Sequence, residues 1–393
     1  MKEAAMSHKP YALQKPFFTP GVYVLLVLMA AGGMTILARF IGGIGYVSNL
    51  SNAYPWGLWI GIDVASGVAL AAGGFTTAAL AHIMGKHHYE PVIRPALLTA
   101  ALGYTFVVLG LLVDIGRSWA IWKPMFFWNT NSVLFEVAMC VMCYLNVLYI
   151  EFLPIITEQF KSRFQILGIL EENLDKIMWI FVIAGVVLSC MHQSSLGSLM
   201  LIAPTKLHPL WYTPILPLLF LLSAIAVGYP MVIFETTIIT CSMNLEDEMN
   251  VLTPLSKFSI YLLGLYMVLK VGDMIVRGTY VYLFDFTAQS NAFLCELGLG
   301  VVLPWILLCC SKVRESRKGL FSVSALIIFG VLFNRINVFI TGFQPVHSHF
   351  SYFPSVGEIL VTTGLIATLM LIYRIAVTWL PVLSAREKNG GVQ

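Results

Sequence analysis

Ten apolar stretches, each about as long as a membrane-crossing helix, fill this 393-residue chain almost from end to end. A helix of roughly 20 residues crosses the hydrocarbon core of a bilayer, whereas membrane strands are shorter and alternate apolar with polar residues. The stretches lie at roughly 21–41, 56–84, 93–116, 131–153, 174–194, 214–240, 257–278, 288–311, 319–341 and 358–380. The sequence therefore predicts an all-α polytopic membrane protein with ten transmembrane helices.

Composition supports this class and limits the alternatives. The chain is 58% hydrophobic and 11% charged, whereas soluble domains carry about 25% charged residues. The net charge of +3 is too small to suggest nucleic acid as a partner, and no basic run is present. The first stretch is too long for a signal-peptide core, so we expect a retained helix. The predicted organisation is a cytoplasmic segment 1–20, a transmembrane domain 21–380 and a cytoplasmic tail 381–393.

Lysine and arginine predict the orientation of the helices. With the N-terminus inside, the inner segments and adjoining helix ends hold fifteen basic residues: Lys2, Lys9, Lys15, Lys86, Arg94, Lys161, Arg163, Lys176, Lys257, Lys312, Arg314, Arg317, Lys318, Arg386 and Lys388. The outer side holds five: Arg39, Arg117, Lys123, Lys206 and Arg277. Because cytoplasmic loops are enriched in Lys and Arg, both termini are expected in the cytoplasm.

Four consecutive predicted helices carry ionisable groups toward the outer side. Asp63 lies two turns into the second helix, Asp114 ends the third beside Arg117, Glu136 begins the fourth and His192 ends the fifth. Buried charge is costly in lipid, so such residues are candidates for a functional site. Reduction of a quinone needs two electrons and two protons, and carboxylates and imidazole suit the proton transfer. An alternative interpretation makes Asp114 and Arg117 a simple interfacial ion pair.

Three further carboxylates, Glu151, Glu235 and Glu296, lie on the inner half or near the middle of the chain's apolar stretches. Chains of carboxylates carry protons in membrane pumps. Glu235 is a stronger candidate for such a route than Glu151, which lies near a helix end and suits an interfacial position.

An internal repeat predicts how the helices are grouped. Four residues recur at an offset of 160: Arg117, Asn131, Leu134 and Glu136 return as Arg277, Asn291, Leu294 and Glu296. Asp114 returns as Asp273, one position out of step. The offset spans four helices, an even number, so the two copies have the same orientation. We therefore expect two parallel four-helix bundles, helices 2–5 and 6–9, flanked by helices 1 and 10.

The histidines and cysteines do not predict a redox cofactor within this chain. A membrane haem b usually takes two axial histidines at matching depth, and the two at helix ends, His82 and His192, lie at opposite faces. Cys140 and Cys143 are one helical turn apart, and an iron–sulfur cluster would need further cysteines nearby. The histidine-rich connector after His82 is interpreted as a solvated loop. We expect no metal site, haem or cluster, so electrons must arrive from or leave to a partner docked over the outer face.

Four segments resemble a known family. They are Tyr54–Asp63, Asp114–Trp119, Asn129–Glu136 and Met191–Leu199. They resemble the NrfD/PsrC family of quinone-reactive membrane subunits, with similarity from about residue 20 to 380. Within it, the chain is similar to the ten-helix HybB type of periplasmic nickel–iron hydrogenases and to HmcC, the membrane subunit of the high-molecular-weight cytochrome c (Hmc) complex of sulfate reducers.

The resemblance implies a haem-free subunit of the bacterial inner membrane that binds menaquinone as a substrate near the periplasmic face. It implies a ferredoxin-like iron–sulfur subunit above that site, and beyond it a multihaem cytochrome c or a nickel–iron hydrogenase. Other membrane subunits are a further expected partner class. By matching positions, the catalytic candidates are His192, Asp114, Glu136 and Asp63. The quinone-binding candidates are Arg117, Asn131, Trp56 and Gln193, and the proton-route candidates are Glu136 and Glu235.

Two other functions remain open from the residues. A secondary transporter or proton pathway shares the repeat and the buried carboxylates, but transporters typically use broken helices and a site at the midplane. A structural anchor without quinone chemistry leaves the polar cluster unexplained, since Leu at those positions would serve an anchor as well.

Overall fold

The computed structural model describes residues 10–12, 16–161, 165–346 and 351–384, so the predicted terminal segments lie partly outside the described residues. Within the described part, ten helices are long and apolar enough to cross a membrane, which confirms the predicted class. In chain order these spans are Pro20–Gly42, Trp59–Ile83, His87–Asp114, Val133–Phe160, Lys176–Ser198, Leu216–Ser242, Met249–Val276, Ala288–Cys309, Arg317–Thr341 and Val356–Trp379.

Most spans are single α-helices, but four are segmented, the third because η3 precedes α5. The long helices are α1 (Pro20–Gly42), α5 (Ile93–Asp114), α6 (Val133–Phe160), α7 (Gln165–Ser198), α8 (Leu216–Ser242), α9 (Met249–Val276), α13 (Arg317–Ile336) and α14 (Val356–Trp379). The second span consists of η1 (Trp59–Ser66), α3 (Gly67–Leu70), α4 (Gly73–Ala78) and η2 (Ala79–Ile83). The eighth consists of α10 (Ala288–Leu297), η7 (Gly298–Val302) and α11 (Leu303–Cys309), and η8 (Asn337–Thr341) ends the ninth. The short elements are α2 (Ile44–Val47), η3 (His87–Val92), η4 (Ser118–Ala120), η5 (Lys123–Met125), η6 (Thr279–Phe284) and α12 (Ser311–Arg314).

Several helices run past the apolar residues that predicted them. The fourth stretch was expected to end at 153, before Pro154, but α6 continues to Phe160. A proline inside a helix removes one backbone hydrogen bond, and a membrane span keeps the rest because lipid offers no other partner. Helix α9 likewise begins at Met249, ahead of the predicted start at 257.

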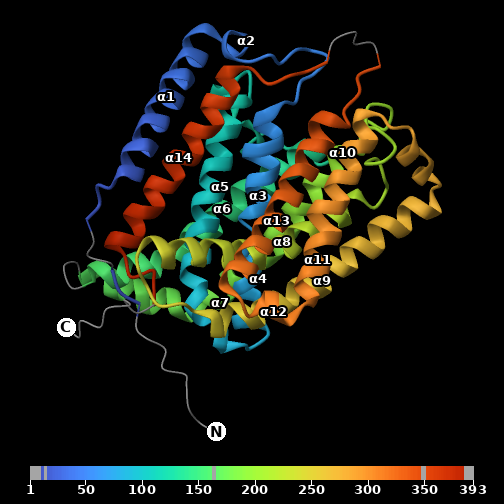
Figure 1. Ribbon diagram of the computed structural model, residues 1–393. Helices are drawn as coiled ribbons and strands as arrows, with labels where there is room; N and C mark the ends of the chain where they lie inside the picture. Colours follow the sequence, from blue (N-terminus) through green and yellow to red (C-terminus); the bar gives the residue numbers. More distant parts are fainter. Residues whose placement is uncertain (1–9, 13–15, 162–164, 347–350, 385–393) are drawn as a thin grey trace.

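The helices form two neighbouring rings of contacts (Figure 1). In the first ring, α4 packs on α5, α5 on α6, α6 on α7, and α7 back on α4. In the second, α8 packs on α9, α9 on α11, η7 on α13, and α13 back on α8. The rings meet where α3, α4 and α7 pack against α8, while α1 and α14 pair beside α5. We call these rings the first and second bundle.

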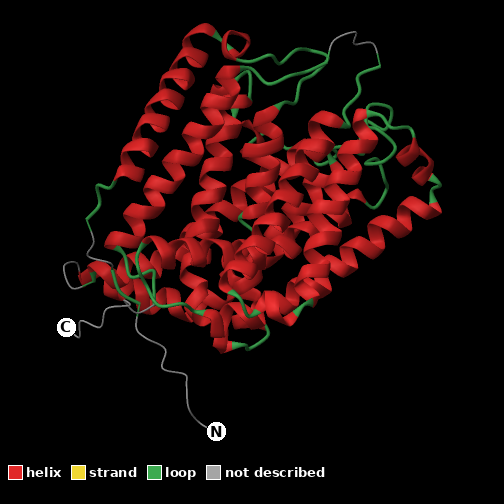
Figure 2. Cartoon of the chain, in the orientation of Figure 1, coloured by secondary structure: helices red, strands yellow, loops and turns green. Residues whose placement is uncertain are grey.

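The two ends of the molecule are defined by the chain termini and by the loops between the helices. Tyr11 pairs with Leu383 in one of two isolated β-bridges, the other joining Leu207 and Phe343, and the described chain is otherwise helix and loop (Figure 2). The end with the Tyr11–Leu383 pair is the terminal face. The α5–α6, α7–α8 and α9–α10 connections lie at the other end, the opposite face.

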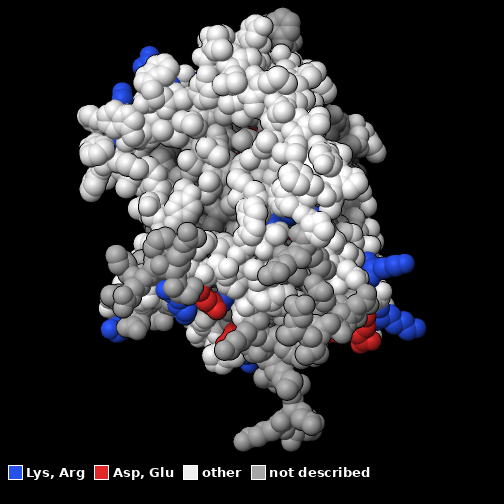
Figure 3. All heavy atoms as spheres, turned by 90° about the vertical axis from the view of Figure 1, so that its left-hand side faces the viewer, with Lys and Arg blue, Asp and Glu red and all other residues white. Residues whose placement is uncertain are grey.

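The surface around α1 suits a lipid environment. On this side of the molecule, acidic and basic atoms gather mainly toward the terminal face, with a few toward the opposite face, and a broad uncharged region lies between (Figure 3). Helix α1 buries little of itself within the protein: only Val22, Gly32 and Arg39 are buried. A helix that is apolar all round and exposed is typical of a lipid-facing span.

Helices α1 and α14 approach each other closely at a pair of glycines. A Cβ atom built on Gly32 would lie 2.7 Å from Gly364 Cα, whereas one built on the next residue, Gly33, meets nothing within 4 Å. Small residues let membrane helices pack backbone to backbone. The α1–α14 contact therefore depends on Gly32 and not on its neighbour.

We predict that Gly32→Leu will destabilise the protein by about 1–3 kcal/mol, because the added side chain forces the two backbones apart. Gly33→Leu, on the same helix, should change stability by less than about 0.5 kcal/mol. Unfolding by SDS titration of the two purified variants measures both values. Equal effects would show that the close contact contributes nothing specific.

Candidate functional site

A buried histidine lies at the centre of the first bundle. His192 of α7 is 1% exposed, and its Nδ1 lies 3.3 Å from the Tyr104 hydroxyl of α5. The rings of Tyr104 and of Tyr144 on α6 pack in an edge-to-face arrangement, with their centroids 4.5 Å apart. The Tyr144 hydroxyl has no hydrogen-bond partner among the described residues. Three helices thus bring one imidazole and two phenols together in the buried interior.

Gln193, the residue after His192, binds the backbone at the point where the second span breaks. Between α3 and α4 the Ala72 amide donates to Ala69, which leaves the Val68 carbonyl without its usual helical donor. The Gln193 side chain donates to that carbonyl at 2.8 Å. Inside a membrane a freed backbone group needs such a partner. The sequence indicated Gln193 but gave no sign that it holds a break in a neighbouring span.

Glu136 reaches the same side of α7 from the start of α6. Its Oε1 accepts a hydrogen bond from Ser195 at 2.5 Å. Ser195 follows His192 by three residues, so the two side chains lie on one helix face. Glu136 itself is exposed and Ser195 is buried. This pair therefore connects the opposite face with the surroundings of His192.

Asp63 and Asp114 form a separate group that faces α14. Asp63 accepts a hydrogen bond from Thr362 at 2.8 Å, and it packs against Gly110, where a built Cβ would lie 3.0 Å away. Asp114 is one turn beyond Gly110 on α5 and interacts electrostatically with Asp63. Among the described residues, no hydrogen bond joins either aspartate to His192 or Glu136.

The basic neighbour of Asp114 is Arg39, which the sequence did not suggest. Its guanidinium donates to the carbonyls of Val113 (2.7 Å) and Ile115 (2.5 Å), on either side of Asp114. It is buried and interacts electrostatically with Asp114. Arginine in the last turn of an otherwise apolar helix was the available signal, since a buried cation needs a partner.

Arg117 was the cation expected beside Asp114, and the structure places it elsewhere. Its side chain is exposed on the opposite face, and no ion pair joins it to Asp114 in the described chain. Asn131 is exposed there as well. Trp56 is half-buried and packs against Phe343, with ring centroids 5.7 Å apart. The interfacial Asp114–Arg117 ion pair is therefore not observed.

A second missed residue, Glu358, completes the group around Asp114. It is fully buried at the start of α14, where it forms a capping box with Ser355 and accepts a hydrogen bond from the Asn49 amide at 2.8 Å. Tyr352 also donates to Glu358. Burial and this carboxylate raise the pKa of the Tyr352 phenol well above its usual range, so the hydroxyl stays a donor. The Ser355-x-x-Glu358 spacing was a readable capping signal.

The second bundle holds a fixed ion pair where the repeat predicted a copy of Glu136. Glu296 is buried and pairs with Lys270 of α9. Its remaining acceptor positions take hydrogen bonds from Trp211 (2.9 Å), Asn334 (2.8 Å) and Asn337 (2.8 Å). Four side-chain donors therefore surround the Glu296 carboxylate.

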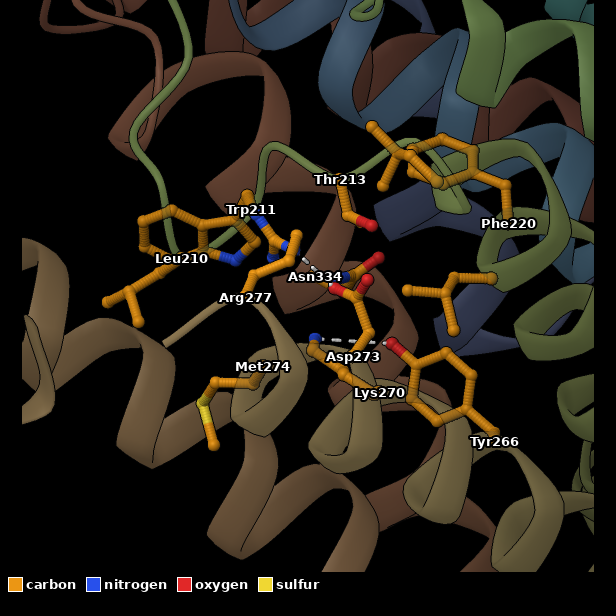
Figure 4. Close-up of a pocket in the computed structure, with 12 residues that line it drawn as sticks. Leu210, Trp211, Thr213, Phe220, Tyr266, Lys270, Asp273, Met274, Arg277 and Asn334 are labelled. Carbon is orange, nitrogen blue, oxygen red and sulfur yellow. Dashed lines mark hydrogen bonds and ion pairs between the residues drawn. The ribbon is translucent and has the colours of Figure 1, made fainter. Parts of the chain in front are cut away.

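A small cavity adjoins this ion pair on the side of the opposite face (Figure 4). Lys270 points from α9 toward the Tyr266 hydroxyl, and Asp273 pairs with Arg277 at 2.8 Å. Leu210, Trp211 and Phe220 supply apolar walls. The cavity volume of about 10 Å³ matches a single water molecule. Asp273 and Arg277 thus form an ion pair, whereas Asp114 and Arg117, their counterparts in the repeat, do not.

Comparison with known proteins shows the family. A family model described as polysulphide reductase, NrfD, matches residues 46–347. The chain belongs to the NrfD family. A protein of Nitratidesulfovibrio vulgaris is 37% identical over 94% of this chain and 96% of its own length. The probable Ni/Fe-hydrogenase 2 b-type cytochrome subunit of Escherichia coli K12 is 32% identical over 98% and 97%. The menaquinone reductase integral membrane subunit of N. vulgaris is 25% identical over 88% and 87%.

The E. coli name mentions a b-type cytochrome, and the donor set of this NrfD family member does not fit a bis-histidine haem. Among the described residues of the spans, His192 is the one buried histidine, and its ring contacts Tyr104. His82 is exposed at the terminal face. The described part also contains no group of three or more His, Cys, Asp or Glu that could hold a metal ion.

The fixed ion pair gives a stability prediction. Lys270→Met should destabilise this NrfD protein by about 3–5 kcal/mol, because it leaves the Glu296 carboxylate buried without its cation. The double variant Lys270→Met/Glu296→Gln should lose less than the single variant, since no buried charge remains there. The exposed Lys123→Met is the control. SDS titration compares all three, and a double variant as unstable as the single one would contradict this account.

Proposed function

We propose that this chain is the quinone-reactive membrane subunit of a respiratory redox complex, with menaquinone as its substrate. The observation that carries the proposal is the buried His192–Tyr104 pair, next to Ser195 and Glu136, in a member of the NrfD family. A relative covering most of the chain is named as a menaquinone reductase subunit, which supports this choice of quinone.

The proposed chemistry is a two-electron, two-proton reduction, with one proton added to each carbonyl oxygen of the quinone. His192 is proposed to donate a hydrogen bond to one oxygen and to relay a proton to it, because histidine is the side chain used most often in general acid–base catalysis. Ser195 and Glu136 would return protons to His192 from the opposite face. Gln193 would hold the broken second span against the head group, and Trp56 would contact its rim.

The remaining sequence candidates take proposed roles that follow their positions. Asp63 and Asp114, near Glu358, would provide the second proton-exchanging group. Arg117 and Asn131 are exposed on the opposite face, so they would contact the head group at the entrance. Glu235 would carry protons from the other side of the membrane.

Electrons are proposed to arrive from or leave to a ferredoxin-like iron–sulfur subunit docked on the opposite face. An aromatic loop there supports a partner: Trp119, Phe126 and Trp128 are each more than two-thirds exposed. Large exposed apolar patches mark interaction sites. Beyond this subunit we propose a multihaem cytochrome c or a nickel–iron hydrogenase.

The proposed location is the bacterial inner membrane, with the opposite face toward the periplasm and both termini in the cytoplasm. The bias of lysine and arginine toward the terminal side supports this orientation. The pairing of Tyr11 with Leu383 supports both termini on one side.

We predict that His192→Ala will weaken binding of the fluorescent menaquinol analogue HQNO by about tenfold, the loss of one good hydrogen bond in a buried site. Fluorescence quenching on the purified complex measures this affinity. Asp114→Asn should weaken binding less, because Asp114 lies in the neighbouring group. His208→Ala, a histidine of the opposite face in the second bundle, is the matched control.

Three outcomes separate the functions considered. Weakening in His192→Ala with an unchanged control supports the site. Tight binding unaffected by His192→Ala and Asp114→Asn would move the site to another part of the chain. Failure of the intact wild-type complex to bind HQNO would count against quinone chemistry and favour a transporter or an anchor.

A further inference from the structure

Three polar atoms from three helices meet on the terminal half of the molecule, and none has a hydrogen-bond partner among the described residues. They are Thr99 Oγ1 of α5, Glu235 Oε1 of α8 and the Tyr373 hydroxyl of α14. Glu235 interacts with both neighbours, although no hydrogen bond of ordinary geometry joins them. Buried polar groups are almost always satisfied. Two hydroxyls and a carboxyl oriented toward one point are the surroundings that a buried water occupies.

A small cavity lies at the terminal face, between α5 and α8 and below the three-atom cluster. Pro95 of α5, Ile239 and Thr240 of α8, and Glu248 before α9 contribute to its lining. Its volume of about 10 Å³ holds one water molecule. Glu248 is the one carboxylate among the lining residues. Burial raises the pKa of Glu248, which brings its proton exchange nearer to neutral pH.

The cavity and the three-atom cluster lie one helical turn apart along α5 and α8. Thr99 follows Pro95 by four residues on α5, and Glu235 precedes Ile239 by four residues on α8. Residues four apart share one face of a helix and are separated by one turn, about 5.4 Å. Both walls of the cavity therefore continue, one turn further into the protein, as the walls of the cluster.

The charges near the cavity mouth are mostly paired. Arg317 pairs with Asp247 and donates to Thr240 at 3.1 Å, and Arg94 pairs with Glu158 at 2.8 Å. Glu248 forms no ion pair with these cations in the described residues. A carboxylate that lines a cavity and lacks a fixed cation is suited to exchange a proton with solvent.

We propose that the cavity at Glu248 and the Glu235–Thr99–Tyr373 cluster form a proton-uptake route that enters the protein at the terminal face. A proton from solution binds Glu248, passes through water in the cavity and reaches the Glu235 carboxylate. Thr99 and Tyr373 are positioning residues that hold the water beside Glu235. Each carboxyl returns to its starting state when the next proton arrives, and the protons end on the reduced quinone. This route rests on the proposed function.

The test uses the intact complex with its own partner subunits, reconstituted into liposomes with menaquinone in the bilayer. An impermeant reductant is added outside, so only complexes whose opposite face points outward are reduced, and their terminal face meets the lumen. Trapped pyranine reports lumenal pH, with valinomycin and K⁺ present to remove the membrane potential. Quinone reduction is followed separately by its ultraviolet absorbance.

In the wild type we expect lumenal alkalinisation that accompanies quinone reduction. Glu248→Gln should slow alkalinisation at least fivefold, and Glu248→Asp should restore part of the rate. Glu235→Gln should abolish it. The matched control is Glu246→Gln, an exposed carboxylate two residues from Glu248, which should behave as wild type. HQNO affinity should stay at the wild-type value in all these variants, which separates a blocked route from a damaged fold.

Two results overturn the route and leave the proposed function standing. One is quinone reduction in the wild type with no change in lumenal pH. The other is alkalinisation in Glu248→Gln at the wild-type rate. A wild-type complex that neither binds HQNO nor reduces menaquinone would instead defeat the proposed function, and the route with it.

Discussion

Lipid offers no hydrogen bonds, so every backbone group left unpaired within a span needs a donor or acceptor from the protein itself. Two features of the first bundle follow from this constraint. The break between α3 and α4 frees the Val68 carbonyl, and Gln193 binds it from α7. The end of α5 leaves the carbonyls of Val113 and Ile115, and Arg39 binds both from α1. The side chains nearest the candidate site thus also hold the backbone around it.

This dual use explains why the groups of the candidate site lie where they do. Gln193 cannot leave Val68 without exposing a carbonyl to an apolar interior, so it fixes the position of α7 and therefore of His192. Arg39 fixes the end of α5 in the same way and brings a cation beside Asp114. The positions of His192 and Asp114 therefore follow from the backbone contacts of their neighbours, Gln193 and Arg39.

The spans were predictable because their signal is local, whereas the site was predictable only in part. Continuous apolar residues reveal a membrane helix without knowledge of its neighbours. His192 and Glu136 were found from their depth in two successive helices, and Gln193 from the family resemblance. Glu358 and Arg39 were missed because α14 and α1 meet the first bundle from opposite ends of the sequence. No spacing pattern in one helix reports a partner about 300 residues away, such as Asn49 for Glu358.

The internal repeat places identical residues in different surroundings in the two bundles. Glu136 and Glu296 occupy matching positions, yet one is exposed and bonded to Ser195, while the other is buried and bound to Lys270. The difference comes from α9: it carries Lys270 at the position where α5 has Gly110, 160 residues earlier. A carboxylate beside a lysine and three neutral donors is fixed in place, because removing its cation would leave a buried charge uncompensated. Around Gly110 the space is taken by Asp63, an acid that forms no ion pair with any of the described residues. Gly110 leaves room for the Asp63 carboxylate, whereas Lys270 fills the matching position with a cation that pairs with Glu296. Two bundles of similar sequence therefore differ in whether their buried carboxylates have a paired cation.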